Sequence, residues 1–168
     1  CAYFLALAGC RPIILDCGFE VENRSEDIKK FYQTRVLDEC SNFLMGEGGA
    51  GTFSDGKLYT RINGDWYGRV VLNEFIRMGA PEEIRYLKRP HIGSDNLFTV
   101  CQKFRTEITR LGGVFKFGVE VADLWCDSGR CAGVIGSSGE KSAGEYVVIA
   151  AGVGGHKLHR ALIRAGVS

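Results

Sequence analysis

The chain has 168 residues, of which 45% are hydrophobic and 24% charged, and its formal net charge is +1 at pH 7. This length fits one domain, and the composition is typical of a globular protein with a sizeable core. The balanced charge argues against nucleic acid as a partner. No apolar stretch reaches the ~20 residues that a membrane span needs, so we also expect no membrane partner.

Seven cysteines are spread along the chain, and no two of them form a C-x-x-C pair. Their spacing is wrong for a zinc site, so the sequence predicts no metal centre. Most of them lie in apolar patterns, which predicts small core residues in a reducing compartment. We therefore expect a cytoplasmic protein, or a plastid one if the source is eukaryotic. The alternative that one of these cysteines provides a catalytic thiol stays open.

The first elements are a helix over 2–8, ended by Gly9, and a strand at Ile13–Leu15. That short apolar run is typical of a parallel strand buried on both faces. It ends at Asp16, and in a βαβ dinucleotide fold an acid in this place binds a ribose hydroxyl. The alternative is that Asp16 only opens a turn, as aspartate often does.

A second helix is predicted from Ser25, which resembles an N-cap followed by first-turn acids, to about Val36. Arg24 lies just before this predicted start. Its side chain could reach a phosphate group or be an ordinary solvated arginine, and the sequence alone leaves both interpretations open.

The most informative stretch is GEGGAGTFSDGKL, from Gly46 to Leu58, which holds five of the 23 glycines in 13 residues. Glycines let a backbone approach a ligand closely and adopt positive φ. Successive N–H groups in such a loop can form a concave nest for oxygen atoms. The hydroxyl groups and Lys57 add further polar partners, so we favour a ligand cradle over a surface turn.

The rest of the chain alternates helices, strands and turns. His91 lies in a loop before the most secure helix and is the best guess for a proton donor, although a structural role is more common for such a histidine. The small residues Ala151 and Gly152 follow an apolar run and would let the backbone approach a bound group. The predicted elements are a strand and turn over 59–66, helices over 68–78 and 94–111, a helix start at 81–83, strands over 114–117, 119–126, 131–135 and 146–150, and a last helix with Leu158, Leu162 and Ile163.

Five stretches also share one order with a known pattern: LDCG at 15–18, SNF through the glycine-rich stretch to TRI at 41–62, APEEI at 80–84, KRPHIGSD at 88–95 and VVIAAG at 147–152. In this order they resemble the uncharacterised FAD-dependent dehydrogenases of bacteria and plastids. These are flavoproteins of the glutathione-reductase type with two dinucleotide-binding domains.

For the adenosine half of FAD, the resemblance implies that Asp16 binds the ribose and that Cys17 and Gly18 shape the turn beside it. It implies that Arg24 lies near the pyrophosphate and that the backbone of Val121 contacts the adenine.

For the rest of the cofactor, the resemblance implies a final turn of Ala151 and Gly152 against the ADP portion. Asp55 and Lys57 would lie near the flavin. The residues that would wrap the ribityl chain and flavin ring are Gly48, Gly49, Ala50, Gly51, Thr52 and Ser54.

The implied fold is α/β, a Rossmann-like three-layer FAD/NAD(P)-binding domain with an inserted α+β section on the substrate side, about 59–95. The implied function is an FAD-dependent oxidoreductase that transfers hydride through flavin N5, with an unknown small-molecule substrate, NAD(P)H as a candidate partner and no identified catalytic residue. Two features depart from the family. The GxGxxG motif expected before Ala2 is absent, which predicts a truncated and inactive chain, and 153–157 differs from the usual segment.

Two alternatives stay open at this point. One is a non-catalytic nucleotide-binding or interaction module that has lost its cofactor site. The other is a flavin-free anabolic or tRNA-modifying enzyme on the same fold, for which no residue specifically argues.

Overall fold

The computed structural model describes residues 1–58, 65–87, 91–152 and 154–166. It is a mixed α/β structure with two small sheets. None of the helices in these ranges is long and apolar enough to cross a bilayer. In chain order the elements are α1 Ala2–Leu7, β1 Ile13–Leu15, α2 Val21–Thr34, a 3-10 helix Gly49–Phe53, α3 Trp66–Arg77, a 3-10 helix Glu82–Arg85, α4 Ser94–Arg110, β2 Val114–Lys116, β3 Val121–Asp127, β4 Arg130–Gly136, β5 Lys141–Ala143 and α5 His156–Arg164.

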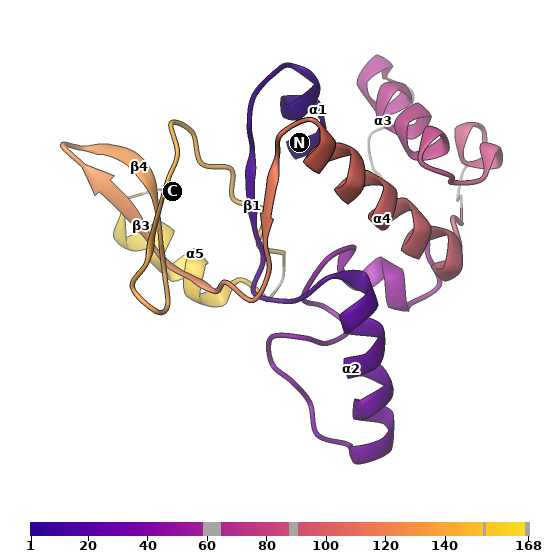
Figure 1. The fold of residues 1–168 in the computed structure, drawn as a ribbon, viewed down its shortest axis with the longest axis horizontal. Coiled ribbons are helices and arrows are strands. Elements are labelled where there is room, and N and C mark those ends of the chain that lie inside the picture. The colour runs from indigo at the N-terminus through magenta and orange to yellow at the C-terminus, as the bar shows by residue number, and fades with distance from the viewer. Residues whose placement is uncertain (59–64, 88–90, 153, 167–168) are drawn as a thin grey trace.

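A pair of parallel strands occupies the middle of the molecule (Figure 1). β1 and β2 pair in register from Ile13 opposite Val114 to Leu15 opposite Lys116. The predicted strand at Ile13–Leu15 is therefore confirmed. It is not buried on both faces, because β2 is its only strand partner in the described ranges and Ile13 remains 47% exposed.

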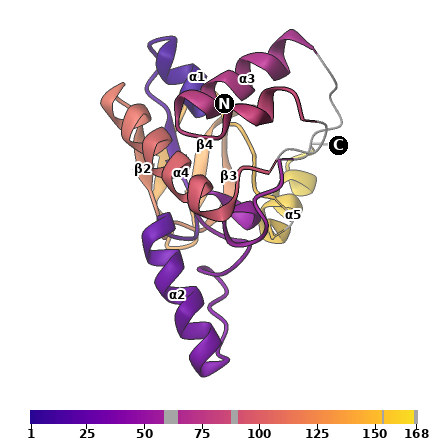
Figure 2. The same ribbon diagram turned by 90° about the vertical axis from the view of Figure 1, so that its right-hand side faces the viewer.

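The main hydrophobic core lies on one side of this pair, where α1, α3 and α4 come together (Figures 1 and 2). The amphipathic helix predicted over 94–111 is confirmed as α4, which buries Val100 and Ile108 in this core. α1 ends before Gly9, as predicted. The fully buried members of the core are Tyr3, Met78, Ala80, Ile84, Ile92, Val100 and Ile108.

The other side of the molecule is an antiparallel sheet in the order β3-β4-β5, against which α5 packs (Figure 1). The turn between β3 and β4 contains Ser128 and Gly129, whose φ angles of 50° and 79° are typical of a tight two-residue hairpin turn. The strands predicted over 119–126 and 131–135 are confirmed as β3 and β4. Together with β5, which was not predicted, they form a sheet separate from the parallel pair.

The structure corrects the start of the second helix. α2 begins at Val21, not after Ser25, because the Val21 amide donates to Glu47 Oε2 at 3.0 Å. A carboxylate distant in sequence thus caps the helix, which no local pattern could predict. Arg24 consequently lies inside the first turns of α2.

The structure also corrects the strand predicted over 146–150, which forms no strand ladder. A strand needs a neighbour for its backbone groups, and the described ranges place none beside it. Tyr146 and Val148 are 85% and 63% exposed. Trp66, predicted to end the turn after a strand, instead begins α3, and Pro81–Glu83 leads only into a 3-10 helix. The predicted strand and turn at 59–64 lie outside the described residues.

We predict that Ile84→Ala lowers the free energy of unfolding by about 3 kcal/mol, because the side chain is 1% exposed in the core. The same substitution at Ile163, which is 72% exposed on α5, is the matched control and should change it by less than about 0.5 kcal/mol. Urea denaturation of both variants measures the difference. Equal losses would contradict this location of the core.

Candidate functional site

One buried arginine organises the glycine-rich stretch. Arg24 of α2 is 0% exposed, and its guanidinium lies 4.7 Å from the centre of the Phe53 ring. It donates hydrogen bonds to four backbone carbonyls, from Nη2 to Asn42 at 2.9 Å and to Gly49 at 3.0 Å, and from Nη1 to Gly46 at 3.4 Å and to Glu47. Burial lowers the pKa of Arg24, and the negative charge of nearby Asp16 opposes that shift.

Arg24 therefore holds a loop in place by bonding several carbonyls at once, which the planar guanidinium with its five donors is suited to do. The solvated alternative is excluded by its complete burial. A contact between Arg24 and a pyrophosphate stays a prediction. In this structure its donors are directed at the loop backbone.

The turn after β1 lies directly against this loop. Asp16 Oδ1 accepts a hydrogen bond from the Gly18 amide at 2.8 Å. The carboxylate therefore shapes a turn, which agrees with the alternative interpretation that Asp16 opens a turn. A Cβ added to Gly18 would lie 2.5 Å from the Cα and the N atom of Gly46. Only glycine permits this approach of two backbones. The described residues offer no hydrogen-bond donor to Asp16 Oδ2.

The glycine-rich stretch folds into a 3-10 helix, Gly49–Phe53, preceded by Gly48 with φ 81°. Part of its backbone is open. A Cβ on Gly49 would meet no atom within 4 Å, and one on Gly51 would meet only Leu97 Cδ1, at 3.8 Å. The opposite side is closed, because Thr52 is 2% exposed. One face of the predicted cradle is therefore accessible bare backbone.

The third predicted segment, Ala151–Gly152, leads to a turn in which the Gly155 amide donates to the Gly152 carbonyl at 3.4 Å. Gly152 has φ 60° and no neighbouring atom within 4 Å of an added Cβ, so its surroundings are open. A Cβ on Gly154 would collide with the Met45 side chain. This turn thus lies against the residue that directly precedes Gly46.

The three predicted segments accordingly meet around Met45 and Gly46. Gly18 contacts Gly46 through its backbone, and Gly154 lies against the Met45 side chain. Met45, which the sequence analysis did not select, occupies part of the space between them. The hydrophobic lead-in to the glycine-rich stretch was the available signal for it.

An ion-pair network that the sequence analysis missed supports the site from α4. Arg105 contacts Glu47 Oε1 at 3.1 Å through Nε and Glu22 Oε1 at 2.6 Å through Nη2. Gln102 donates to Glu22 at 2.7 Å. Burial raises the pKa of Glu47. Burial alone would also raise the pKa of Glu22, but hydrogen bonds from Gln102 and Arg105 outweigh it and lower that pKa.

A second polar pair lies under the 3-10 helix. Thr52 Oγ1 is buried and has no hydrogen-bond acceptor or donor at bonding geometry among the described residues, and Cys101 Sγ of α4 is close to it beside Gly48. Burial and the charge of Glu47 raise the pKa of the Cys101 thiol to about 11. This thiol is therefore protonated at neutral pH and is a poor nucleophile.

The remaining predicted residues lie at the edges of the site. Asp55 and Lys57 form an exposed ion pair with each other, which lowers the pKa of Asp55. Ser54 is exposed. His91, the candidate proton donor, is bridged to Lys57 through the backbone. Val121 begins β3, two residues after Val119, whose amide donates to the Asp16 carbonyl at 3.0 Å.

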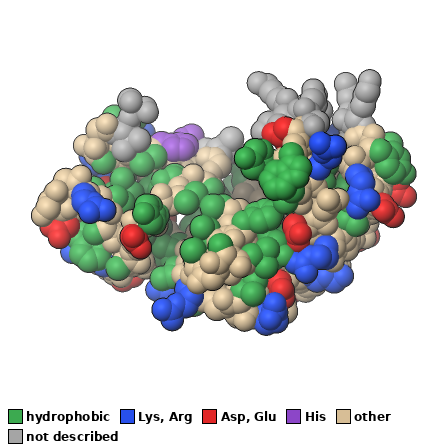
Figure 3. Space-filling model, turned by 90° about the horizontal axis from the view of Figure 1, so that it is seen from above, with side chains coloured by type: hydrophobic (Ala, Val, Ile, Leu, Met, Phe, Trp, Pro, Cys, Tyr) green, Lys and Arg blue, Asp and Glu red, His purple; other side chains and the backbone are tan. Residues whose placement is uncertain are grey.

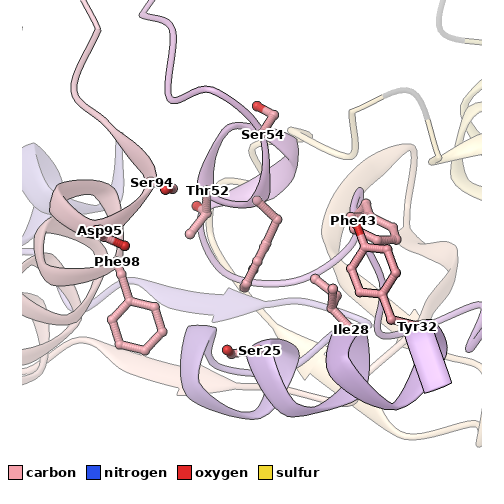
Figure 4. Close-up of a pocket in the computed structure, with 10 residues that line it drawn as sticks. Ser25, Ile28, Tyr32, Phe43, Thr52, Ser54, Ser94, Asp95 and Phe98 are labelled. Atoms are coloured by element: carbon pink, nitrogen blue, oxygen red, sulfur yellow. The ribbon is translucent and has the colours of Figure 1, made fainter.

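An open groove of about 530 Å³ runs between α2, the glycine-rich stretch and the start of α4 (Figure 4). Figure 4 shows Phe98 on the α4 side, Tyr32 and Phe43 on the opposite side, and Ser54 above. The groove combines aromatic rings with hydroxyl groups, and Asp95 is the one charged residue that lines it in the described ranges. Its lining residues are Ser25, Ile28, Tyr32, Phe43, Thr52, Phe53, Ser54, Ser94, Asp95 and Phe98.

The cysteine prediction is largely wrong. Cys17 and Cys101 are half-buried, but five of the seven cysteines are exposed and none belongs to the buried core. No group of metal-binding side chains is present in the described ranges. The five exposed cysteines are Cys1, Cys10, Cys40, Cys126 and Cys131.

We predict that Arg24→Lys lowers the free energy of unfolding by about 3 kcal/mol, because one ammonium cannot replace the bonds to four carbonyls and would remain buried. It should also speed amide hydrogen exchange at 46–53. Arg160→Lys, on an exposed part of α5, is the matched control and should leave both unchanged. Unaltered exchange in Arg24→Lys would show that the loop does not depend on Arg24.

A pH prediction follows from the opposite pKa shifts of Glu47 and Glu22. Because the pKa of folded Glu47 lies above its ordinary value of 4.5, stability relative to Glu47→Gln should rise as pH falls from 7 to 4.5. The pKa of folded Glu22 is lowered, so stability relative to Glu22→Gln should fall as pH drops through 4.5. Urea denaturation at several pH values measures both differences, and slopes of the same sign would refute the assignment.

No protein-family model matches this chain. A protein of Clostridium beijerinckii (strain ATCC 51743 / NCIMB 8052), described only as an uncharacterized protein, is 38% identical over 167 residues. The match covers 99% of this chain and 31% of that relative. The chain thus spans about a third of the length of the curated relative it matches.

Proposed function

We propose that this chain is part of an FAD-dependent oxidoreductase and contributes the residues that hold the adenosine and ribityl parts of the cofactor. One observation carries the proposal. Three segments far apart in sequence, 16–18, 46–51 and 152–155, meet around Met45 and Gly46, and two of them present open glycine backbone. An extended dinucleotide needs such a set of close backbone approaches.

The residues present suit FAD by their chemistry. Asp16 has one carboxylate oxygen engaged in its own turn, and its second oxygen is available for a ribose hydroxyl. Gly49, Gly51 and Gly152 offer space in which a Cβ would meet no close atom. Arg24 keeps the cradle in one conformation by its bonds to the loop carbonyls, so the site is ordered before a ligand arrives.

The proposal extends to the Rossmann-like three-layer fold. β1 has a strand partner on one edge only, and the apolar run 146–150 has none in the described ranges. Figure 3 shows hydrophobic side chains gathered around a hollow in the middle of one face. A further parallel strand, contributed by a longer polypeptide, would pair with β1 and with 146–150 and would cover this apolar surface.

FAD would supply the redox chemistry by accepting or giving hydride at its N5 atom. The chain's own residues would bind and orient the cofactor. Gly49 and Gly51 would approach it through the backbone, and Lys57, at the end of the stretch, would add positive charge near the ring. His91 is bridged to Lys57 and is the residue we would test as a proton donor. The substrate of the proposed oxidoreductase is unassigned.

Gly51→Ala tests this function without disturbing the fold. Its added methyl group would lie 3.8 Å from Leu97 Cδ1 and would otherwise face open space, so we expect a change in unfolding free energy below about 1 kcal/mol. In the bound state the same methyl group would collide with the cofactor. We therefore predict at least about a tenfold weaker affinity for FAD, measured by calorimetry on the 168-residue chain and on the chain extended by its neighbouring sequence.

The control is Gly144→Ala, directly after β5. Its Cβ would lie 3.3 Å from the Tyr146 carbonyl oxygen, and the substitution should leave the affinity for FAD unchanged. Equal FAD affinities for the native chain and Gly51→Ala would contradict the proposed cradle. If neither form binds FAD, the alternative of a non-catalytic nucleotide-binding or interaction module is favoured. Binding of ADP without FAD would point to the same alternative.

A further inference from the structure

Two exposed cysteines face each other across the β3–β4 hairpin. Cys126 lies directly opposite Cys131 in the antiparallel register, next to the closing pair Asp127 and Arg130. Both cysteines are exposed and both are free thiols. Residues in directly opposite positions project from the same face of a sheet, so the two thiols share one side of the hairpin.

The turn fixes the spacing of this pair. A two-residue turn places a hydrogen-bonded pair at Asp127 and Arg130, and the next pair is then a non-hydrogen-bonded one. In such a pair the Cα atoms are about 4.5 Å apart, which lies within the range of roughly 4.4–6.8 Å that a disulfide tolerates. The backbone is therefore compatible with a bridge without rearrangement.

The local structure also keeps the two strands from sliding. Immediately beyond the cysteine pair the strand register shifts by one residue. There Trp125 pairs with Gly133, which leaves Ala132 as an extra residue on β4. Beyond it, Leu124 pairs with Val134, and Lys141 of β5 lies 4.6 Å from the centre of the Trp125 ring. These contacts hold the hairpin in one register, so each cysteine meets the same partner.

We propose that Cys126 and Cys131 form a reversible intramolecular disulfide, which makes the tip of this hairpin a redox-responsive site. The bond would close a small loop at an exposed place, and exposed disulfides are typically the labile ones. This inference does not depend on FAD binding, because a low-molecular-weight disulfide such as oxidised glutathione suffices as the oxidant.

The reaction balances as two exchange steps. The thiolate of one cysteine attacks a sulfur of oxidised glutathione, which forms a mixed disulfide and releases one glutathione thiolate. The second cysteine then attacks the mixed disulfide at the protein sulfur and releases the second glutathione. The protein loses two protons and two electrons, and one glutathione disulfide gains them and becomes two thiols.

Trypsin gives a direct test, because Arg130 lies between the two cysteines. The reduced 168-residue chain is equilibrated in buffers with varied ratios of oxidised to reduced glutathione, quenched with acid, alkylated, denatured and digested. We expect peptides 117–130 and 131–141 to appear joined and to separate on reduction. The joined species should form at ratios at least about tenfold lower than those that glutathionylate exposed Cys40, because the second step is intramolecular.

Cys131→Ser is the matched variant. Because Cys131 is exposed, the variant should keep the fold, which circular dichroism checks. It should abolish the joined peptides and leave Cys126 carrying glutathione. The proposal is overturned if the two peptides stay separate at every ratio, if both cysteines carry glutathione at once, or if Cys126 is joined to another cysteine of the native chain.

Discussion

The buried guanidinium of Arg24 is the constraint on which the arrangement of the site depends. A charged group without access to water must be satisfied by polar atoms, and here the atoms are the carbonyls of Asn42, Gly46, Glu47 and Gly49. A loop rich in glycine would otherwise have many accessible conformations. Binding several of its carbonyls to one rigid fork selects a single conformation and ties it to α2.

The other supports of the site act on the same loop. Glu47, at the start of the glycine-rich stretch, caps α2 at Val21 and pairs with Arg105 of α4. Gly18 allows the turn after β1 to lie against Gly46. The loop is thus connected to the first strand, to the second helix and to the core helix. Its open face, at Gly49 and Gly51, is left for a ligand.

Local sequence patterns predicted the elements that local physics determines. The apolar periodicity over 94–111 was sufficient to predict α4, and Gly9 was sufficient to predict the end of α1. The tight turn of the β3–β4 hairpin follows from Ser128 and Gly129. Contacts between distant residues were not predictable in this way. Glu47 moves the start of α2 to Val21 from 26 residues away, and the burial of Arg24 depends on carbonyls that have no signature in sequence.

The strand predicted over 146–150 also shows that a local sequence pattern does not determine contacts with distant residues. Its apolar side chains fit a buried strand, but a strand exists only with a neighbour, and the described ranges place none beside it. For the site, composition located the glycine-rich stretch. Asp16 and Gly152 were selected because each follows an apolar run, and the resemblance selected them again. It selected neither Met45 nor Arg105, because these residues act through packing and charge pairing in three dimensions.

A titration of the isotope-labelled chain with FAD, followed by amide chemical shifts, tests the central claim most directly. If the three segments share one ligand, the amides of Gly18, Gly49, Gly51 and Gly152 should shift together and give one common dissociation constant, while those of the β3–β4 hairpin tip stay in place. Shifts confined to one segment, or different dissociation constants for the three, would contradict a shared site around Gly46.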